Sequence, residues 1–490
     1  MRTQKTEFKI HSIKYNLLMN MILKISGFIF PLITFPYVSR ILLSEGTGRI
    51  AFAQSVISYY TLVASLGIPA YGVRKCAQVR EDNQALTKCV KELLIINSIC
   101  MVISYLAFIV MTFTISKFAA EKELLFITSL TIVLNTVGVE WFYQAIEQYD
   151  YITIRNLAFK VVSIILMFAF VHEQKDYLIY GSISIVGSVG SNFLNFLRLH
   201  KYIDLRQPGK LDVMQHLKPI FTLFLYYAAT TIYTNLDIVM LGFMTNDVET
   251  GYYNAAVKLK NVLVGAIIAI GSVSLPRASS YLASDKNDDF KRLISLSSNL
   301  ILFLAIPLCV YFVINADYTI QVLSGDDFIN AVPAMRIITP SIICIGITSI
   351  TAYQLLIPLG KNNVTLLGAV AGALVDLIIN MLLIPHLGAG GAAIGTLVAE
   401  LIVLIIHFGC LKEYRQDIIN LKEMFRIVIA TAFGSIVVLL MRKIPFGNSF
   451  FQLLITGSVF AICYMTCSYV LKTNITTYIL SEIKKRRKRS

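Results

Sequence analysis

The sequence predicts an all-α membrane protein with about fourteen transmembrane helices, and three observations support this fold class. Of the 490 residues, 56% are hydrophobic and 15% are charged, and the mean hydropathy is +0.69. Soluble domains usually carry about 25% charged residues. The apolar residues form runs of roughly 20, which is long enough for a helix to cross a hydrocarbon core of about 30 Å. Basic residues gather between alternate runs, as they do in proteins of fixed membrane topology.

Fourteen apolar segments are expected to form helices. They are 15–39, 50–72, 90–112, 123–145, 153–171, 177–197, 219–242, 252–276, 294–315, 332–357, 364–385, 390–411, 427–444 and 450–471. With both termini in the cytoplasm, about 32 Lys and Arg fall in cytoplasmic segments and about 8 in external ones. The net charge of +14 therefore indicates membrane topology, and no nucleic-acid partner is expected. The basic run 484–489 is also placed to meet membrane lipids.

Two matching stretches of sequence suggest that the chain contains a repeat. Gly48 opens the second helical segment and Gly251 opens the eighth, an offset of 203 residues that also carries Arg74 onto Arg277. Because six helices return the chain to the same side, the repeat is expected to be parallel, with two six-helix bundles followed by two additional helices. The predicted division is 1–215 and 216–412 for the two bundles, 413–472 for the additional helices and 473–490 for a basic cytoplasmic tail.

The motifs of enzymes and of nucleotide-driven pumps are absent from the sequence. The pairs Gly209-Lys210 and Gly360-Lys361 lack the Ser or Thr and the upstream glycine of a phosphate-binding loop. The spacing of Gly391 and Gly395 favours close helix packing. No external loop exceeds about 15 residues, which leaves little room for an external active site. We expect a protein that is not an enzyme, with no cofactor, no metal site and no disulfide.

Ionisable residues inside apolar helices carry an insertion cost of at least about 2.5 kcal/mol, so each one calls for an explanation. Lys24, Lys258 and Lys260 lie within the first and eighth segments, where they are candidates to line a cavity for an anion. Asp237 in the seventh segment is a candidate partner of Lys258. Such a pair would neutralise buried charge, and it could also take part in gating.

Two further groups of polar residues are candidates for function. Asp376 and Asn380 are four residues apart and thus share a helix face, and Glu400 lies midway along the next segment. These side chains could take up protons or Na⁺, or they could be packing partners. Arg40 and Arg49 are expected on either side of a short external turn. They could anchor the helix ends at the interface or attract an anion to the outer mouth.

Several segments together form a pattern that covers nearly the whole chain. They are Phe35–Leu42, Ala51–Ser55, Leu66–Gly72, Trp141–Ala145, Tyr151–Asn156, Asn235–Gly242, Gly251–Ala256, Leu383–Pro385, Gly390–Ala393 and Glu400. With these segments the chain resembles the bacterial polysaccharide repeat-unit flippases. These belong to a superfamily shared with multidrug-and-toxin extruders and the peptidoglycan-precursor flippase.

The resemblance implies a flippase that moves undecaprenyl-diphosphate-linked oligosaccharide from the inner to the outer leaflet of the bacterial cytoplasmic membrane. We further expect alternating access, coupling to H⁺ or Na⁺, and contact with polysaccharide polymerase machinery. A cation-coupled multidrug extruder and a non-transporting partner of polysaccharide assembly stay open as alternatives. The residues expected to bind substrate are Lys24, Arg40, Arg49, Lys258 and Lys260, and those expected to gate or couple ions are Asp237, Asp376, Asn380 and Glu400.

The predicted topology can be tested by thiol labelling. In a variant stripped of its native cysteines, a cysteine at Lys175 should react with a membrane-impermeant reagent added outside, whereas one at Gln207 should be protected. The reason is that the basic segments stay in the cytoplasm. The reverse labelling pattern would overturn the orientation.

Overall fold

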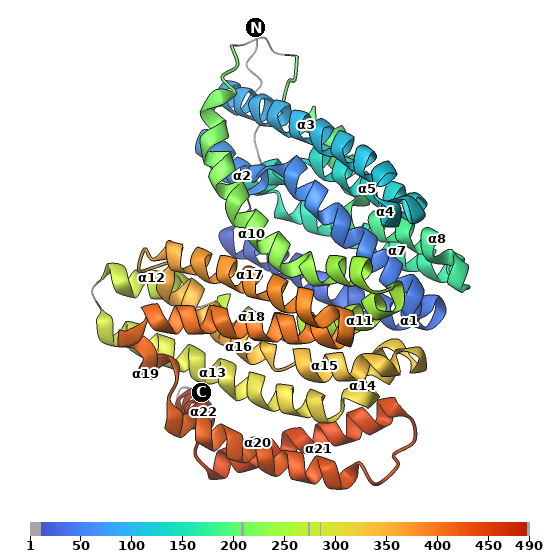
Figure 1. Ribbon diagram of the computed structural model, residues 1–490. Coiled ribbons are helices and arrows are strands. Elements are labelled where there is room, and N and C mark those ends of the chain that lie inside the picture. The colour runs from blue at the N-terminus through green and yellow to red at the C-terminus, as the bar shows by residue number, and fades with distance from the viewer. Residues whose placement is uncertain (1–10, 207–209, 273–274, 285, 488–490) are drawn as a thin grey trace. The chain divides into compact units, whose positions relative to one another are not determined.

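The computed structural model describes residues 11–206, 210–272, 275–284 and 286–487, which form helices joined by short connections (Figure 1). No β-strand occurs in these ranges. The chain divides into two compact units, Met1–Gly251 and Tyr252–Ser490. This division follows packing, and the division into repeats expected from the sequence stays a prediction.

The first unit comprises α1 (Ile13–Ser65), α2 (Ile68–Val79), α3 (Asn83–Thr114), α4 (Ser116–Ala120), α5 (Lys122–Gly138), α6 (Glu140–Ala145), α7 (Tyr149–Phe170), η1 (Gln174–Asp176), α8 (Tyr177–Ile185), η2 (Val186–Gly190), α9 (Asn192–Leu199), α10 (Met214–Met244) and the start of α11 (Asp247–Ser272). The second unit comprises the rest of α11, α12 (Leu275–Ala283), α13 (Asn287–Ile314), α14 (Ala316–Ser324), η3 (Asp326–Ala331), α15 (Val332–Ile338), α16 (Ser341–Ile350), η4 (Thr351–Leu356), α17 (Asn362–Leu387), α18 (Ala389–Cys410), η5 (Lys412–Tyr414), α19 (Arg415–Ile418), α20 (Leu421–Met441), α21 (Ser449–Val470) and α22 (Asn474–Arg487).

Helix length and composition agree with a multi-pass membrane protein. Within the described ranges, 9 helices are long and apolar enough to span a membrane, or up to 11 when two bent pairs count as single spans. All fourteen segments expected from the sequence overlap helices, and the first two lie in one continuous stretch, Ile13–Val79. The all-α membrane fold is confirmed, and the count of fourteen stays a prediction.

The connection between the first two expected helices differs from the prediction. The sequence predicts a short turn between Arg40 and Arg49, but α1 continues through this region. Only Leu43 leaves the helical conformation, with φ 56° and ψ −173°. Side chains rarely adopt a left-handed φ, so this residue is strained and breaks the helix. The interruption between the two expected helices is therefore a single residue and not a loop.

Each unit is organised around a helix that contacts many others. In the first unit, α1 packs against α3, α5, α7 and α10, and its Phe52 is fully buried. In the second unit, α13 packs against α16 and α20, while α17 and α18 lie close together. A Cβ added at Gly391 of α18 would lie 2.7 Å from the carbonyl oxygen of Leu383. The predicted close helix packing at this glycine is therefore confirmed.

The two glycines that suggested a repeat lie against each other within the first unit. A Cβ added at Gly48 would stand 1.8 Å from the carbonyl oxygen of Asp247, and one added at Gly251 would stand 2.0 Å from that of Ser44. Adding the offset of 203 to Ser44 gives Asp247, and adding it to Gly48 gives Gly251. Each glycine therefore contacts the residue that corresponds to its neighbour in the other stretch. Reciprocal contacts of this kind are typical of a two-fold relation. The superposition of the complete halves stays a prediction.

This close backbone approach leads to a testable expectation for stability. Gly48→Ala and Gly251→Ala should each destabilise the protein by about 1–3 kcal/mol, because the added methyl groups meet backbone atoms that cannot yield. Gly27→Ala is the matched control, since no atom lies within 4 Å of its added Cβ in the same helix α1. Thermal unfolding of the purified variants measures the effect. Equal melting temperatures for Gly48→Ala and Gly27→Ala would contradict the observed contact.

Candidate functional site

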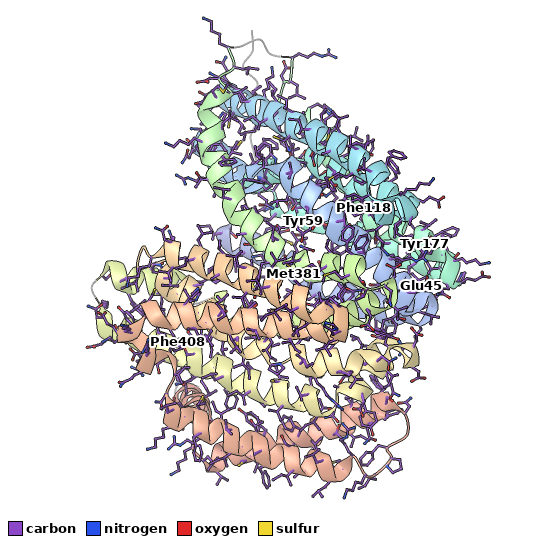
Figure 2. All side chains as sticks on the ribbon, viewed as in Figure 1. Glu45, Tyr59, Phe118, Tyr177, Met381 and Phe408 are labelled. Carbon is purple, nitrogen blue, oxygen red and sulfur yellow. The ribbon has the colours of Figure 1, made fainter. Side chains whose placement is uncertain are left out.

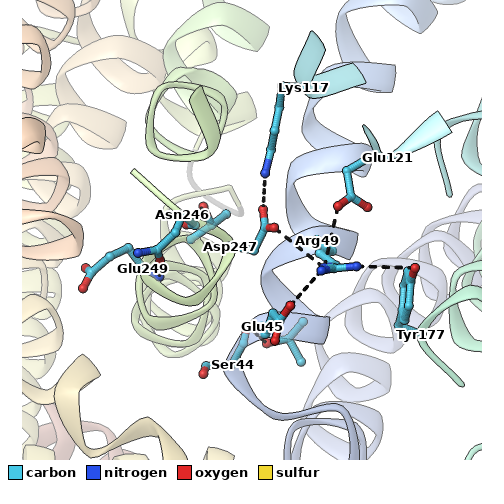
Figure 3. A network of polar contacts seen from close by, with 11 residues as sticks. Ser44, Glu45, Arg49, Lys117, Glu121, Tyr177, Asn246, Asp247 and Glu249 are labelled. Carbon is cyan, nitrogen blue, oxygen red and sulfur yellow. Dashed lines mark hydrogen bonds and ion pairs between the residues drawn. The ribbon is translucent and has the colours of Figure 1, made fainter. Parts of the chain in front are cut away.

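A cluster of charged side chains surrounds Arg49 of α1 (Figure 3). Arg49 Nη2 is 2.7 Å from Glu45 Oε1, and its Nε is 3.7 Å from both Glu121 Oε1 and Asp247 Oδ2. Glu121 follows α4, and Asp247 is the first residue of α11. The guanidinium thus connects three segments that are far apart in sequence.

Two more side chains complete this cluster, which we call the Arg49 network. Lys117 of α4 donates from Nζ to Asp247 Oδ1 at 2.7 Å, and its Nζ lies 5.4 Å from the centre of the Phe52 ring. Tyr177, at the start of α8, lies 5.3 Å from Arg49 by its ring centre. Glu45 and Tyr177 lie near the same end of the first unit (Figure 2). The network therefore joins α1, α4, α8 and α11 through side chains.

Three carboxylates and two cations give the Arg49 network one excess negative charge. Glu121 is only 8% exposed. Burial raises the pKa of its carboxyl above the usual value, and the attraction of Arg49 offsets only part of this effect. Burial therefore makes ionisation of Glu121 less favourable than it is in water, despite the attraction of Arg49.

In the second unit, polar residues are buried between α17 and α18. Asp376 and Asn380 are both at most 1% exposed. They face Gly395 of α18, where an added Cβ would stand 2.2 Å from Asn380 Oδ1 and 2.8 Å from Asp376 Oδ1. Their predicted position on one helix face is confirmed. Two side-chain oxygens are thus held beside a helix that has no side chain at this point.

A second face of α18, turned about 120° from Gly395, carries further buried polar residues. Thr396, Glu400 and His407 are all buried, and their spacing of four and seven residues keeps them on one side of the helix. The hydroxyl groups of Tyr253 and Thr396 are 2.7 Å apart, and Thr351 Oγ1 is 2.7 Å from His407 Nδ1. Helix α18 therefore carries a polar stripe that forms hydrogen bonds with α11 and η4 of the second unit.

The remaining candidates occupy different surroundings. Lys24 is exposed on α1, and the guanidinium of Arg40 donates to the carbonyl oxygen of Pro36 on the same helix. Lys258 and Lys260 are half-buried in α11. Asp237 is buried in α10 of the first unit, whereas Lys258 belongs to the second. The proposed Asp237–Lys258 pair stays a prediction.

Sequence reasoning overlooked a lysine on α7. Lys160 is half-buried, and its Nζ donates to Ser26 Oγ of α1 at 2.8 Å. Lys24 and Lys160 each lie eleven residues into their helices, roughly 17 Å from the start. The depth criterion that selected Lys24 would have found Lys160 as well. Lys117, Glu121 and Asp247 left no such signal, because they lie in short connections or at helix ends.

Comparison with known proteins identifies the family. The model of the family described as "Polysaccharide biosynthesis protein" matches residues 13–282, more than half of the chain. The chain belongs to this family. Its relatives include a Shigella dysenteriae protein described as "Putative O-antigen transporter", with 23% identity over 81% of this chain and 100% of the relative. An Escherichia coli K12 protein with the same description is 22% identical over 80% of this chain and 95% of its own length.

Solved structures share the fold of this family member. The lipid II flippase MurJ in an inward closed conformation has a TM-score of 0.72 and 15% identity, covering 93% of this chain and 98% of MurJ. The MATE multidrug transporter DinF-BH has a TM-score of 0.57 and 13% identity, covering 85% of this chain and 99% of the transporter. The all-α membrane fold expected from the sequence is confirmed by these structures.

The Arg49 network predicts how stability depends on pH. Because the pKa of Glu121 is raised in the folded state, its ionisation opposes folding above that raised pKa. This destabilisation disappears as the pH falls toward 4.5, the pKa that the carboxyl group has in the unfolded chain. Glu121→Gln should therefore raise the melting temperature at about pH 8, and the gain should shrink toward about pH 5.

Melting curves of wild type, Glu121→Gln and the control Glu123→Gln, recorded across this range, measure the difference. Glu123 is exposed two residues further along the chain and should show no such trend. If the increase in melting temperature caused by Glu121→Gln became larger at lower pH, the ionised Glu121 would not be destabilising in the folded protein.

Proposed function

We propose that this protein is a flippase that carries undecaprenyl-diphosphate-linked oligosaccharide to the outer leaflet of the bacterial cytoplasmic membrane, by alternating access and without catalysing a reaction. The relatives described as O-antigen transporters, matched over almost their full length, support a polysaccharide-related cargo. The MurJ-like fold supports a lipid-linked one. Both termini are assigned to the cytoplasm by the charge distribution.

The structural observation that carries this proposal is the pair of lysines on α1 and α7. Lys24 and Lys160 each lie eleven residues from the start of their helices, and the α7 lysine reaches Ser26, two residues from Lys24. No carboxylate lies within ion-pair distance of either lysine in the ranges that the structure describes. Unneutralised cations at depth suit a diphosphate head group, which cannot cross hydrocarbon unaided.

Energy for outward movement is available from the membrane potential. A negative interior favours export of an anion by about 2.3 kcal/mol per charge per 100 mV. We further propose that Asp376, Asn380 and Glu400 couple transport to H⁺ or Na⁺. Carboxylate and amide oxygens are suitable ligands for a hard cation, and a buried carboxylate can also hold a proton. We also propose that the cargo path or its gate includes Lys258, Lys260, Arg40 and Asp237.

A multidrug extruder of the same fold is the second candidate. The buried acidic residues Asp376 and Glu400 and the likeness to DinF-BH favour it. Its cargo is cationic, so loss of the lysines should leave its transport intact. The effect of removing the lysines on transport therefore distinguishes the two functions.

Export of surface polysaccharide tests the proposed function. In a flippase-null strain, Lys24→Ala combined with Lys160→Ala, Lys258→Ala or Lys260→Ala should reduce export about ten- to hundredfold, because contacts to charged groups contribute about 1.5–3 kcal/mol. Arginine at these positions should retain more activity than alanine, since it keeps the charge. Lys14→Ala, exposed near the start of the same helix, is the control at matched expression. Full export by all three double variants would reject a cationic cargo path.

A further inference from the structure

Three tyrosines pack together near the start of α7 and the end of α9, within the first unit. The ring of Tyr143 on α6 lies 5.2 Å from that of Tyr151 on α7 and 6.1 Å from that of Tyr202, which follows α9. The Tyr143 hydroxyl donates to the carbonyl oxygen of Asn195 at 2.7 Å. These contacts fix the position of the Tyr151 ring relative to α9.

Two arginines approach this same ring. The guanidinium carbon of Arg198 lies 4.0 Å from the centre of the Tyr151 ring, and that of Arg155 lies 5.5 Å from it. Arg198 also donates from Nη2 to the Tyr202 hydroxyl at 3.1 Å. Stacking on aromatic faces orients a guanidinium without using its hydrogen-bond donors. The donors that are not bonded to Tyr202, Glu140 or Asn192 therefore remain available to a ligand.

The charges of this cluster do not balance. Arg155 Nη2 is 3.2 Å from Glu140 Oε2, so Arg155 has one carboxylate partner. Arg198 has no carboxylate within ion-pair distance in the described part of the chain. Two guanidinium groups thus share one carboxylate, which leaves one excess positive charge.

Arg155 also has unused donors. Its side chain is 3% exposed, and its Nε and Nη1 have no hydrogen-bond acceptor among the described residues. Leaving a buried donor unsatisfied costs about 1–3 kcal/mol. Arg198 and Glu140 are only partly buried, so an anion can reach the cluster from their side. A phosphate group offers the planar pairs of oxygens that a guanidinium fork prefers.

The outer surface of α9 suggests that this phosphate is attached to a lipid. Phe193, Phe196 and Leu197 are exposed on α9, on the sides away from the buried Asn192 and Asn195. In a membrane such residues contact hydrocarbon chains. Arg198 is adjacent in sequence to this apolar surface. A phosphate bound at the arginines would therefore have space for its hydrocarbon tail alongside α9.

We propose that Arg155, Arg198 and Tyr151 form a binding site for the phosphate end of a lipid, and that its ligand is the diphosphate of the carrier lipid. This assignment rests on the proposed function. The site lies at the end of the unit where the basic segments gather, separate from the lysines at depth. It receives the head group before translocation, with Arg198 making the first contact and Arg155 completing the pair.

Lipid binding to the purified full-length protein in detergent tests the site. Polyprenyl diphosphate, phosphatidylglycerol and inorganic pyrophosphate serve as probes, with dissociation constants measured by native mass spectrometry. Arg198→Ala should weaken binding of polyprenyl diphosphate about tenfold or more, as expected for a hydrogen-bonded charge. Arg198→Lys should fall between wild type and alanine, because it keeps the charge and loses the planar stacking.

The matched control is Arg206→Ala, which removes one exposed positive charge beyond α9 and should change affinity less than about twofold. The double variant Glu140→Gln, Arg155→Gln keeps the local charge balance and should also weaken binding about tenfold. Inorganic pyrophosphate should compete with the lipid, since both present the same phosphate oxygens.

Unchanged affinity in Arg198→Ala and in the double variant would overturn the site. Equal weakening for polyprenyl diphosphate and phosphatidylglycerol would overturn the carrier lipid as the ligand and identify ordinary anionic lipid. The proposed function is judged separately, by whether the wild-type chain restores export in a flippase-null strain. Failure there, with intact lipid binding, would reject the flippase and leave the binding site standing.

Discussion

The contact of Gly48 with the backbone of Asp247 determines where the charged groups of the first unit can meet. With no side chain at Gly48, the start of α11 approaches α1 closely enough for Asp247 to reach both Arg49 and Lys117. Glu45 and Arg49 both follow the break at Leu43 and share one side of the helix because they are four residues apart. A larger residue at Gly48 would separate the segments and leave several half-buried charges without partners, which is costly.

Much of the fold could be predicted from the sequence because it follows from local patterns. Apolar runs of membrane length specify helices whatever their neighbours are, and all fourteen expected segments overlap helices. The shared face of Asp376 and Asn380 likewise follows from a spacing of four residues. The missing turn before Arg49 could not be foreseen, because a strained leucine in place of a loop depends on tertiary packing.

The candidate sites were less predictable for a physical reason. Insertion cost identifies ionisable residues inside helices, but it says nothing of groups at helix ends. Lys117 and Asp247 are 130 residues apart, and Glu121 is paired through Arg49 of another helix. Arg155 was recognised only as part of a family-like segment, since its incomplete hydrogen bonding appears only when α6, α7 and α9 come together. Such contacts between distant segments leave no period or motif in the sequence.

The environments of the basic residues suggest that they have different roles. Arg49 has three carboxylates within 3.7 Å, and an anionic cargo would have to displace them. We therefore favour a role for Arg49 in closing one end of the first unit, and contact with substrate stays a prediction. Lys160 instead meets a hydroxyl group, which neutralises no charge and competes weakly with phosphate. A transporter must release its cargo as well as bind it. Lysines held by hydroxyl groups or left exposed meet this requirement better than arginines held by carboxylates.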